Sequence, residues 1–462
     1  MTEVVTSGKA CSVNPLKLSP ALGGALAFLG IDGALPLFHG SQGCTAFALV
    51  LMVRHFREAI PLQTTAMNEL TTILGGAENV EQAIDNIRER NNPRLIGICS
   101  TALTETRGED MAADLRTMRA RRPEWGDLEV VYASTPDYGG SLEEGWGKAV
   151  TATIEALVPE GSATRTLRQV NLLPGSHLTA ADIEELRDLI ESFGLTAIVL
   201  PDLSNSLDGH VPDRHIPTSL GGTPVDTIPA MGRSVLTLAV GEHMRPAAEA
   251  LRRRTGVPYR LFDRLTGLEP TDALVATLIE LSGADAPERL RRERSRLVDA
   301  MLDGHFYFDG RTVAIAGEPD LLLALASFFS GLGSRITAAV APVHSPSLAG
   351  VPAPRVVVGD LDDLQDAATG CDLIVANSHA GDIAQRLGAP LYRVGFPVYD
   401  RLGAAQRLTV GYRGTRQMII DLANRFIDSA HHEHGQEAAG PGGTGDGYAG
   451  AKEERHAQAQ AR

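Results

Sequence analysis

Short apolar runs that alternate with helix-like segments recur along this 462-residue chain. The clearest runs are rich in Val, Ile and Leu and end in polar or glycine-containing turns, which is typical of buried strands. They include RLIGICS (94–100), RQVNLLPG (168–175) and RTVAIAG (311–317). Strands that are linked in sequence by helices run parallel in one sheet. The pattern therefore predicts an α/β fold with mainly parallel sheets.

The alternation of strand-like and helix-like segments restarts twice along the chain, which divides the chain into three units. A prior of ~150 residues per domain also favours three units for a chain of this length. We expect parallel-sheet units at 1–165, 166–305 and 306–430, with the first fifteen residues polar and extended. From residue 431 onward Gly, Ala, Glu, Gln and Lys predominate, so we expect a disordered tail over 431–462.

The net charge and the positions of the cysteines argue against several classes of protein. The formal net charge of −15 argues against a general nucleic-acid surface or an anionic-membrane surface. No run approaches the ~18 apolar residues that span a bilayer, so we expect no membrane partner. The four cysteines (Cys11, Cys44, Cys99 and Cys371) are scattered and form no CxxC pair. This usage predicts the reducing cytoplasm and no disulfide framework.

The stretch from Pro36 to Arg57 contains the best candidate for chemistry, Cys44. An apolar run, a small-residue turn and a long apolar segment predict a strand, a tight loop and a helix. Cys44 then enters the first helical turn, where unpaired N–H groups and the helix dipole favour a thiolate. Gly40 and Gly43 permit close approach of the backbone. A thiolate there can attack an electrophile or bind a metal, and both alternatives remain open.

Simpler interpretations compete with this one. A lone cysteine is most often a small buried side chain, as the settings of Cys99 and Cys371 suggest, whereas Cys11 reads as an exposed thiol. At the far end of the Cys44 helix, basic residues could steer anions, pair with Glu58 or simply be solvated. No P-loop, GxSxG or HExxH motif occurs, and the nearest dinucleotide match, at 331–333, precedes a strand. A single cysteine cannot hold an iron–sulfur cubane, which needs four ligands.

Several longer runs carry a family resemblance. They are NPLKLSPALGGALAFLG (14–30), HGSQGC (39–44), RHFRE (54–58) and PLQTTAMNE (61–69). They resemble the β-type subunits of the nitrogenase component 1 family, and the likeness extends from about residue 10 to 428. This resemblance implies three Rossmann-like domains with mainly parallel sheets around a central cleft.

Departures from the catalytic members of that family point to its assembly scaffolds. The catalytic β subunit supplies three cysteines to an eight-iron cluster, and only one of them is matched here, by Cys44. Ser19 and Ala102 stand where the other two would fall. Cys11 and Cys99 lie near these places but out of register, and a three-residue shift beside a strand reverses the face of the side chain.

The resemblance then implies a scaffold subunit for biosynthesis of the nitrogenase iron-molybdenum cofactor rather than an enzyme. Cys44, with Gly40 and Gly43 beside it, would be one ligand of a [4Fe–4S] cluster shared with a homologous E subunit in an α2β2 heterotetramer. The partner would hold most of the transient iron-molybdenum cofactor precursor. The nitrogenase iron protein, a cofactor-precursor donor and apo-nitrogenase would be further partners.

Two other classes remain as alternatives. One is a catalytic β-type subunit, of nitrogenase or of light-independent protochlorophyllide reductase, which substrate reduction by the complex would reveal. The other is a metal-free α/β binding or glycosyl-transfer protein in which Cys44 belongs to the core. An iron-free complex would favour that second class.

Overall fold

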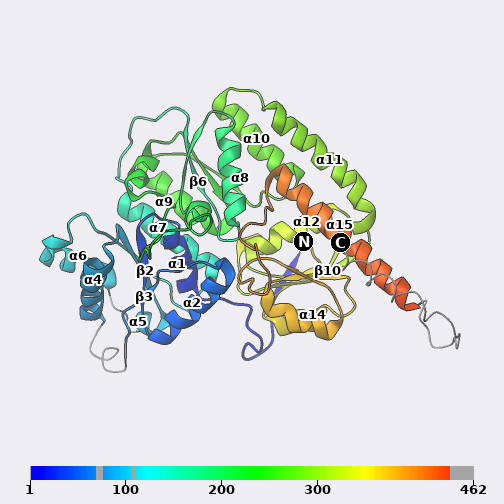
Figure 1. Cartoon of the computed structure of the whole chain (residues 1–462), viewed down its shortest axis with the longest axis horizontal. Coiled ribbons are helices and arrows are strands. Elements are labelled where there is room, and N and C mark those ends of the chain that lie inside the picture. Colours follow the sequence, from blue (N-terminus) through cyan, green and yellow to red (C-terminus); the bar gives the residue numbers. More distant parts are fainter. Residues whose placement is uncertain (1, 69–75, 107, 109, 438–462) are drawn as a thin grey trace, which may run out of the picture.

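Parallel β-strands form the framework of the chain in a computed structural model that describes residues 2–68, 76–106, 108 and 110–437 (Figure 1). The strands in this part are β1 (Glu3–Thr6), β2 (Ala34–His39), β3 (Gln63–Thr64), β4 (Leu95–Ser100), β5 (Glu129–Ala133), β6 (Gln169–Leu173), β7 (Thr196–Val199), β8 (Leu236–Val240), β9 (Tyr259–Phe262), β10 (Thr312–Ala316), β11 (Arg335–Ala341), β12 (Arg355–Val358), β13 (Leu373–Ala376) and β14 (Leu391–Arg393).

These strands make three sheets, with the orders β3-β2-β4-β5, β7-β6-β8-β9 and β1-β12-β11-β10-β13-β14. The pairings between neighbouring strands are parallel. In Figure 1 the first sheet lies at the lower left, the second at the top and the third at the right. β2 and β4 are buried along their whole length, as expected for central strands covered on both faces. The predicted α/β fold with three parallel-sheet units is confirmed.

Helices link the strands and cover the sheets. The α-helices of the described ranges are α1 (Pro20–Leu29), α2 (Gln42–Phe56), α4 (Ala77–Asn91), α5 (Ala102–Glu105), α6 (Met111–Arg121), α7 (Leu142–Leu157), α8 (Ala180–Glu191), α9 (Arg245–Thr255), α10 (Leu268–Ser282), α11 (Glu288–Phe308), α12 (Pro319–Gly331), α13 (Leu361–Ala367), α14 (Gly381–Leu387) and α15 (Gly411–Glu437). Short 3-10 turns occur at η1 (Pro123–Trp125), η2 (Leu203–Asn205), η3 (Val225–Arg233), η4 (Glu242–Met244), η5 (Pro346–Gly350) and η6 (Ser378–Ala380).

The amino-terminal strand β1 joins the sheet that is most distant from it in sequence. Glu3 to Thr6 pair in parallel with Arg355 to Val358 of β12. Just beyond β1, the Lys9 ammonium lies 2.9 Å from carboxylate oxygens of both Asp360 and Asp362. The extended conformation expected for this segment is present, but its place in the third sheet was not predicted.

Helices α1 and α7 of the first unit pack closely against each other, and α7 also contacts the second unit. Every residue of α1 is buried. A Cβ atom at Gly145 would lie 1.8 Å from the Pro20 carbonyl oxygen, and one at Gly23 would lie 1.9 Å from the Leu142 carbonyl oxygen. Only glycine permits this approach. Trp146 of α7 donates its indole N–H to the Pro174 carbonyl, 3.0 Å away in the second unit.

The carboxyl-terminal helix corrects one sequence prediction. α15 continues to Glu437, so residues 431–437 are helical and do not belong to a disordered tail. The remaining part of the predicted tail, 438–462, lies outside the described residues. α15 packs along α11, and the two helices lie side by side with α10 at the outer edge of the molecule (Figure 1). α10 itself was not predicted.

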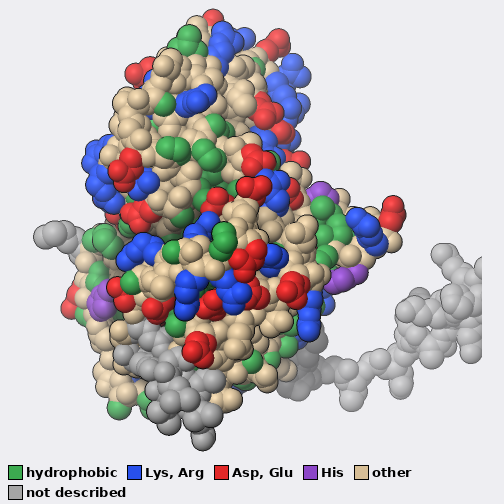
Figure 2. Space-filling view, turned by 90° about the vertical axis from the view of Figure 1, so that its left-hand side faces the viewer, with side chains coloured by type: hydrophobic (Ala, Val, Ile, Leu, Met, Phe, Trp, Pro, Cys, Tyr) green, Lys and Arg blue, Asp and Glu red, His purple; other side chains and the backbone are tan. Residues whose placement is uncertain are grey.

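The surface carries charges of both signs. On the face shown in Figure 2, basic and acidic side chains are interspersed and apolar side chains occur in small groups. Within the described ranges, none of the helices combines the length and the apolar character that crossing a membrane requires.

Candidate functional site

The turn between β2 and α2 has the form predicted for the Cys44 loop. β2 ends at His39, and α2 begins at Gln42 after an extended N-cap residue, Ser41. A Cβ atom at Gly40 would lie 2.4 Å from the Thr101 hydroxyl oxygen, so this turn requires a glycine. At Gly43 the nearest contact of such an atom is 3.9 Å away, with Ser41, so Gly43 faces open space.

Cys44 lies in the first turn of α2, as predicted, and its side chain is exposed. Its Sγ atom is 3.5 Å from the Ser41 hydroxyl oxygen. The Ser41 side chain caps no backbone N–H group of the helix, and the first turn contains no acidic residue. The positive end of a fifteen-residue helix is therefore directed at the surface beside the thiol, where it favours an anionic group.

Large apolar side chains continue the exposed surface along α2. Phe47 is 78% exposed and Val50 is 53% exposed. With Cys44 they follow a spacing of three residues, which places them on one side of the helix. We call Cys44, Phe47 and Val50 the α2 stripe. The opposite side of the helix is buried through Thr45, Ala48 and Met52. Neighbouring apolar side chains exposed on one helix face are typical of a protein–protein contact.

The basic end of α2 binds the third unit. The buried His55 ring accepts a hydrogen bond from the Val398 N–H through Nδ1 at 2.9 Å, and burial lowers the pKa of His55 to about 4. Arg57 donates to the Tyr399 carbonyl oxygen at 2.7 Å, and the Arg54 guanidinium lies 4.1 Å from the centre of the Tyr399 ring. These residues anchor a loop of the third unit, while Arg54 and Arg57 remain exposed, so anion steering at this helix end stays a prediction.

Ser19 and Ala102, where the family resemblance implied cysteine ligands in catalytic members, have other surroundings here. The Ser19 hydroxyl accepts from the Ala21 N–H at 3.2 Å as the N-cap of α1, and it donates to the Asp137 carboxylate. Ala102 begins the short helix α5. The preceding Thr101 hydroxyl donates to the His39 carbonyl at 3.1 Å and so joins α5 to the Cys44 loop.

The other cysteines occupy different environments. Cys99 is completely buried in β4, where a Cβ atom at Gly24 would lie 2.8 Å from its Sγ atom. Burial raises the pKa of Cys99 well above the usual thiol range. Cys371 is also buried, and Cys11 is exposed in the amino-terminal segment. Cys99 therefore faces the core, as predicted for an inert side chain.

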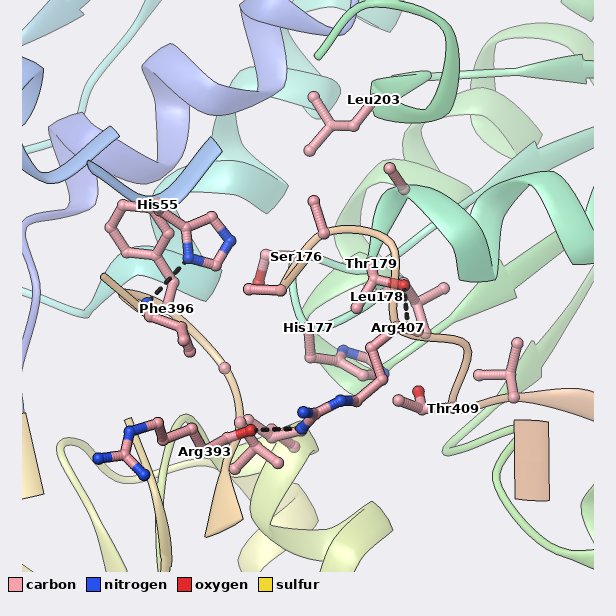
Figure 3. A pocket seen from close by; sticks show the side chains of 18 of the residues that line it. His55, Ser176, His177, Leu178, Thr179, Leu203, Arg393, Phe396, Arg407 and Thr409 are labelled. Atoms are coloured by element: carbon pink, nitrogen blue, oxygen red, sulfur yellow. Dashed lines mark hydrogen bonds between the residues drawn. The ribbon is translucent and has the colours of Figure 1, made fainter. Parts of the chain in front are cut away.

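A cavity of about 100 Å³ lies where the three units meet (Figure 3). Its lining includes His55 from the first unit, His177 from the second and Arg393 from the third. Arg407 Nη1 donates to the Arg393 carbonyl oxygen at 2.9 Å, and the Thr179 hydroxyl donates to the Arg407 carbonyl oxygen at 2.8 Å. The central cleft that the resemblance implied is present, and the Thr179 hydrogen bond joins the second unit to the third across it.

Sequence reasoning missed two parts of this arrangement. The exposure of Phe47 and Val50 was not predicted, although the run TAFALVLMV (45–53) is apolar on every side of the helix. Since the other face of α2 meets the core, such a run leaves apolar side chains exposed. The residues of the cavity come from separate units, and no local pattern connects them.

Comparisons with known proteins agree with this architecture. The profile of the family described as Nitrogenase component 1 type Oxidoreductase matches residues 19–427. The chain is 53% identical over 433 residues to the nitrogenase iron-molybdenum cofactor biosynthesis protein NifN of Mesorhizobium japonicum, covering 93% of this chain and 94% of that protein. The NifN protein of Klebsiella pneumoniae is 40% identical over 436 residues, covering 94% of this chain and 95% of its own.

A solved structure of nitrogenase Cp1 at pH 6.5 superimposes with a TM-score of 0.87 at 30% identity, covering 93% of this chain and 96% of that one. The chain therefore belongs to the nitrogenase component 1 type oxidoreductase family. Within this family, its sequence is similar along nearly its whole length to proteins named NifN. The family resemblance predicted from the motifs is confirmed.

Proposed function

We propose that this chain is a scaffold subunit for biosynthesis of the nitrogenase iron-molybdenum cofactor, and that it assembles a cofactor rather than catalysing a reaction of its own. The observation that carries the proposal is the exposed Cys44 thiol at the start of α2, on a stripe of exposed apolar side chains. A thiol in this setting is a ligand that a second subunit can complete. The relatives that share this chain's length are named for the same biosynthesis.

Cys44 would be one of four thiolate ligands of a [4Fe–4S] cluster, with three supplied by a homologous E subunit. The residues present fit one corner of such a cluster. Gly40 sets the turn that projects the thiol, and the open space at Gly43 lets the backbone come near a bulky group. The N–H groups of the first turn of α2 are positioned to donate to cluster sulfurs, which raises the reduction potential.

The α2 stripe supports a subunit interface around that cluster. Phe47 and Val50 would be covered by the E subunit, and two such pairs would form an α2β2 heterotetramer. The partner would hold most of the cofactor precursor. The nitrogenase iron protein, a precursor donor and apo-nitrogenase would then act on the assembled complex.

The test is the anaerobic complex with its E subunit carrying Cys44→Ala. Because Cys44 is exposed, we expect an unchanged melting temperature, a loss of the iron of one shared cluster per chain and a loss of its electron paramagnetic resonance signal. Cys11→Ala is the matched control, since Cys11 is also an exposed thiol and should leave iron unchanged. Unchanged iron and an unchanged signal in Cys44→Ala would contradict the proposed ligand.

The same preparation separates the alternative functions. Reduction of substrates at nitrogenase-like rates, with the iron protein present, would identify a catalytic β-type subunit instead. A colourless complex with no bound iron would identify a metal-free binding protein. Ser19 and Ala102 argue against the first outcome because both positions have structural roles without a thiolate.

A further inference from the structure

A second set of metal-ligating side chains lies away from Cys44, where the three units meet. His177 follows β6, His243 belongs to η4 and Asp320 lies in the first turn of α12. One ligand atom from each of the three lies within 4.8 Å of the others. Figure 3 shows His177 at the edge of the central cavity. This set brings together residues that no sequence motif connects.

His243 is fully engaged and orients its neighbour. Its Nδ1 lies 2.5 Å from Asp320 Oδ2, and its Nε2 accepts from the Ser176 N–H at 3.1 Å. The bond at Nε2 leaves the ring proton on Nδ1, which donates to the carboxylate. This hydrogen bond fixes the orientation of the Asp320 carboxyl group.

Two atoms of the set are shielded from solvent and have no hydrogen-bond partner among the described residues. They are Nδ1 of His177 and Oδ1 of Asp320. A buried polar atom without a partner is destabilising, so such atoms in a native protein call for an explanation. An imidazole nitrogen and a carboxylate oxygen that lie close together are both donors to a cation.

The charged groups around Asp320 also favour a bound cation. Glu143 of α7 is buried and accepts from the Asp320 N–H at 3.2 Å, so two buried carboxyl groups are neighbours. Among the ion pairs of the described residues, only His243 approaches either of them, and no Lys or Arg does. Buried carboxylates are normally paired with a cation or bound to a metal.

We propose that His177 and Asp320 bind a transition-metal dication such as Zn²⁺, with His243 as the residue that positions Asp320. Mixed imidazole and carboxylate ligands suit this class of metal, and a histidine that fixes a ligating carboxylate is a common supporting interaction. The site is independent of the cluster proposed at Cys44. It would join the second unit to the third through one ion.

Two glycines keep space beside these ligands. A Cβ atom at Gly241 would lie 2.8 Å from Asp320 Oδ2 and 3.0 Å from the Cε1 atoms of both histidines. A Cβ atom at Gly175 would lie 2.8 Å from Nδ1 of His177. Any larger residue at either position would press on the ligands.

The test uses the complex with its E subunit, dialysed anaerobically against a chelator and then titrated with Zn²⁺ or Co²⁺. We expect one equivalent of metal per chain, a rise of a few degrees in melting temperature with Zn²⁺, and d–d absorption bands from Co²⁺ in a nitrogen and oxygen environment. His177→Gln and Asp320→Asn should abolish both effects. His305→Gln, which changes an exposed histidine of α11, should preserve them.

Equal metal binding in all variants, or no Zn²⁺-dependent shift in the unaltered complex, would overturn the proposal. If the substituted chains do not fold, zinc-edge X-ray absorption on the unaltered, zinc-loaded complex decides. A nitrogen and oxygen shell with imidazole scattering supports the site, whereas a sulfur shell assigns the metal to a cysteine and refutes it.

Discussion

Cys44 and Cys99 both lie near the carboxyl ends of neighbouring strands, β2 and β4, but Cys44 is exposed and Cys99 is buried. In the pairing of β2 with β4, Phe38 lies opposite Cys99 and His39 lies opposite Ser100. Cys99 is still inside its strand, so its side chain points into the core against α1. Cys44 comes after its strand has ended, in the first turn of α2, and its side chain points outward.

This difference shows that a cysteine placed a few residues beyond the end of a strand can be exposed for binding, whereas a cysteine within the strand is used for packing. In parallel sheets, binding groups collect in the loops at the carboxyl ends of the strands, because side chains within the strands are used for packing. Cys44 meets that condition and Cys99 does not. Cysteine content alone therefore says little about this chain, and the position of each cysteine relative to its strand says more.

Iron content gives the largest expected contrast. Cys99→Ala should leave the iron of the complex unchanged, whereas Cys44→Ala should remove one shared cluster per chain. Truncation of the buried Cys99 thiol should cost about 1 kcal/mol of unfolding free energy, close to the value for one buried methylene. Iron analysis and urea unfolding on both variants check this. A loss of iron in Cys99→Ala with an intact fold would break the comparison.

Thiol reactivity is the next contrast. In the purified chain at mildly alkaline pH, iodoacetamide should modify Cys44 and leave Cys99 untouched until denaturant is added. Burial both blocks access to Cys99 and raises its pKa above the usual range, so no thiolate forms there. Mass spectrometry of peptides locates the label. Protection of Cys44 on addition of the E subunit would sharpen the assignment of the interface.

The two sides of α2 should differ in stability. Met52→Ala removes a completely buried side chain and should cost about 2–5 kcal/mol. Phe47→Ala changes an exposed side chain and should alter stability by no more than about 0.5 kcal/mol, while weakening association with the E subunit. Urea unfolding and gel filtration measure the two effects. Unaltered association of the Phe47 variant would remove the α2 stripe from the interface.

The two glycines of the Cys44 loop should show the smallest contrast. Gly40→Ala forces a methyl group against Thr101 and should cost about 1–3 kcal/mol. Gly43→Ala meets open space in the first helical turn and should change stability by about 0.5 kcal/mol or less. Thermal unfolding checks both. Equal losses at the two positions would show that the turn is not constrained by Thr101.

Much of the fold was accessible from sequence because each unit is built from local patterns. β10 was predicted nearly residue by residue from the run RTVAIAG (311–317). The strand, turn and helix around Cys44 were predicted for the same reason. α10 was missed although Gly267 precedes it and Gly283 ends it, which are the boundary signals that the sequence offers.

The rest depends on contacts between distant residues. β1 has no apolar run that distinguishes it from an extended tail, and its partner β12 lies at the other end of the chain. The roles of His55 and Arg57 depend on a loop of the third unit, so a helix end that reads as solvated is in fact partly buried. His177, His243 and Asp320 come from separate elements, and only the packing of the second unit against the third brings them together.

The pairing of β1 with β12 also sets an order of events during synthesis. The first strand of the chain cannot find its neighbour until Arg355 to Val358 have left the ribosome. Until then, the first residues stay outside any sheet while the first two units can already form. Closing this long loop is slow compared with pairing neighbouring strands. The third sheet is therefore completed last, when β1, which is synthesised before β12, pairs with it.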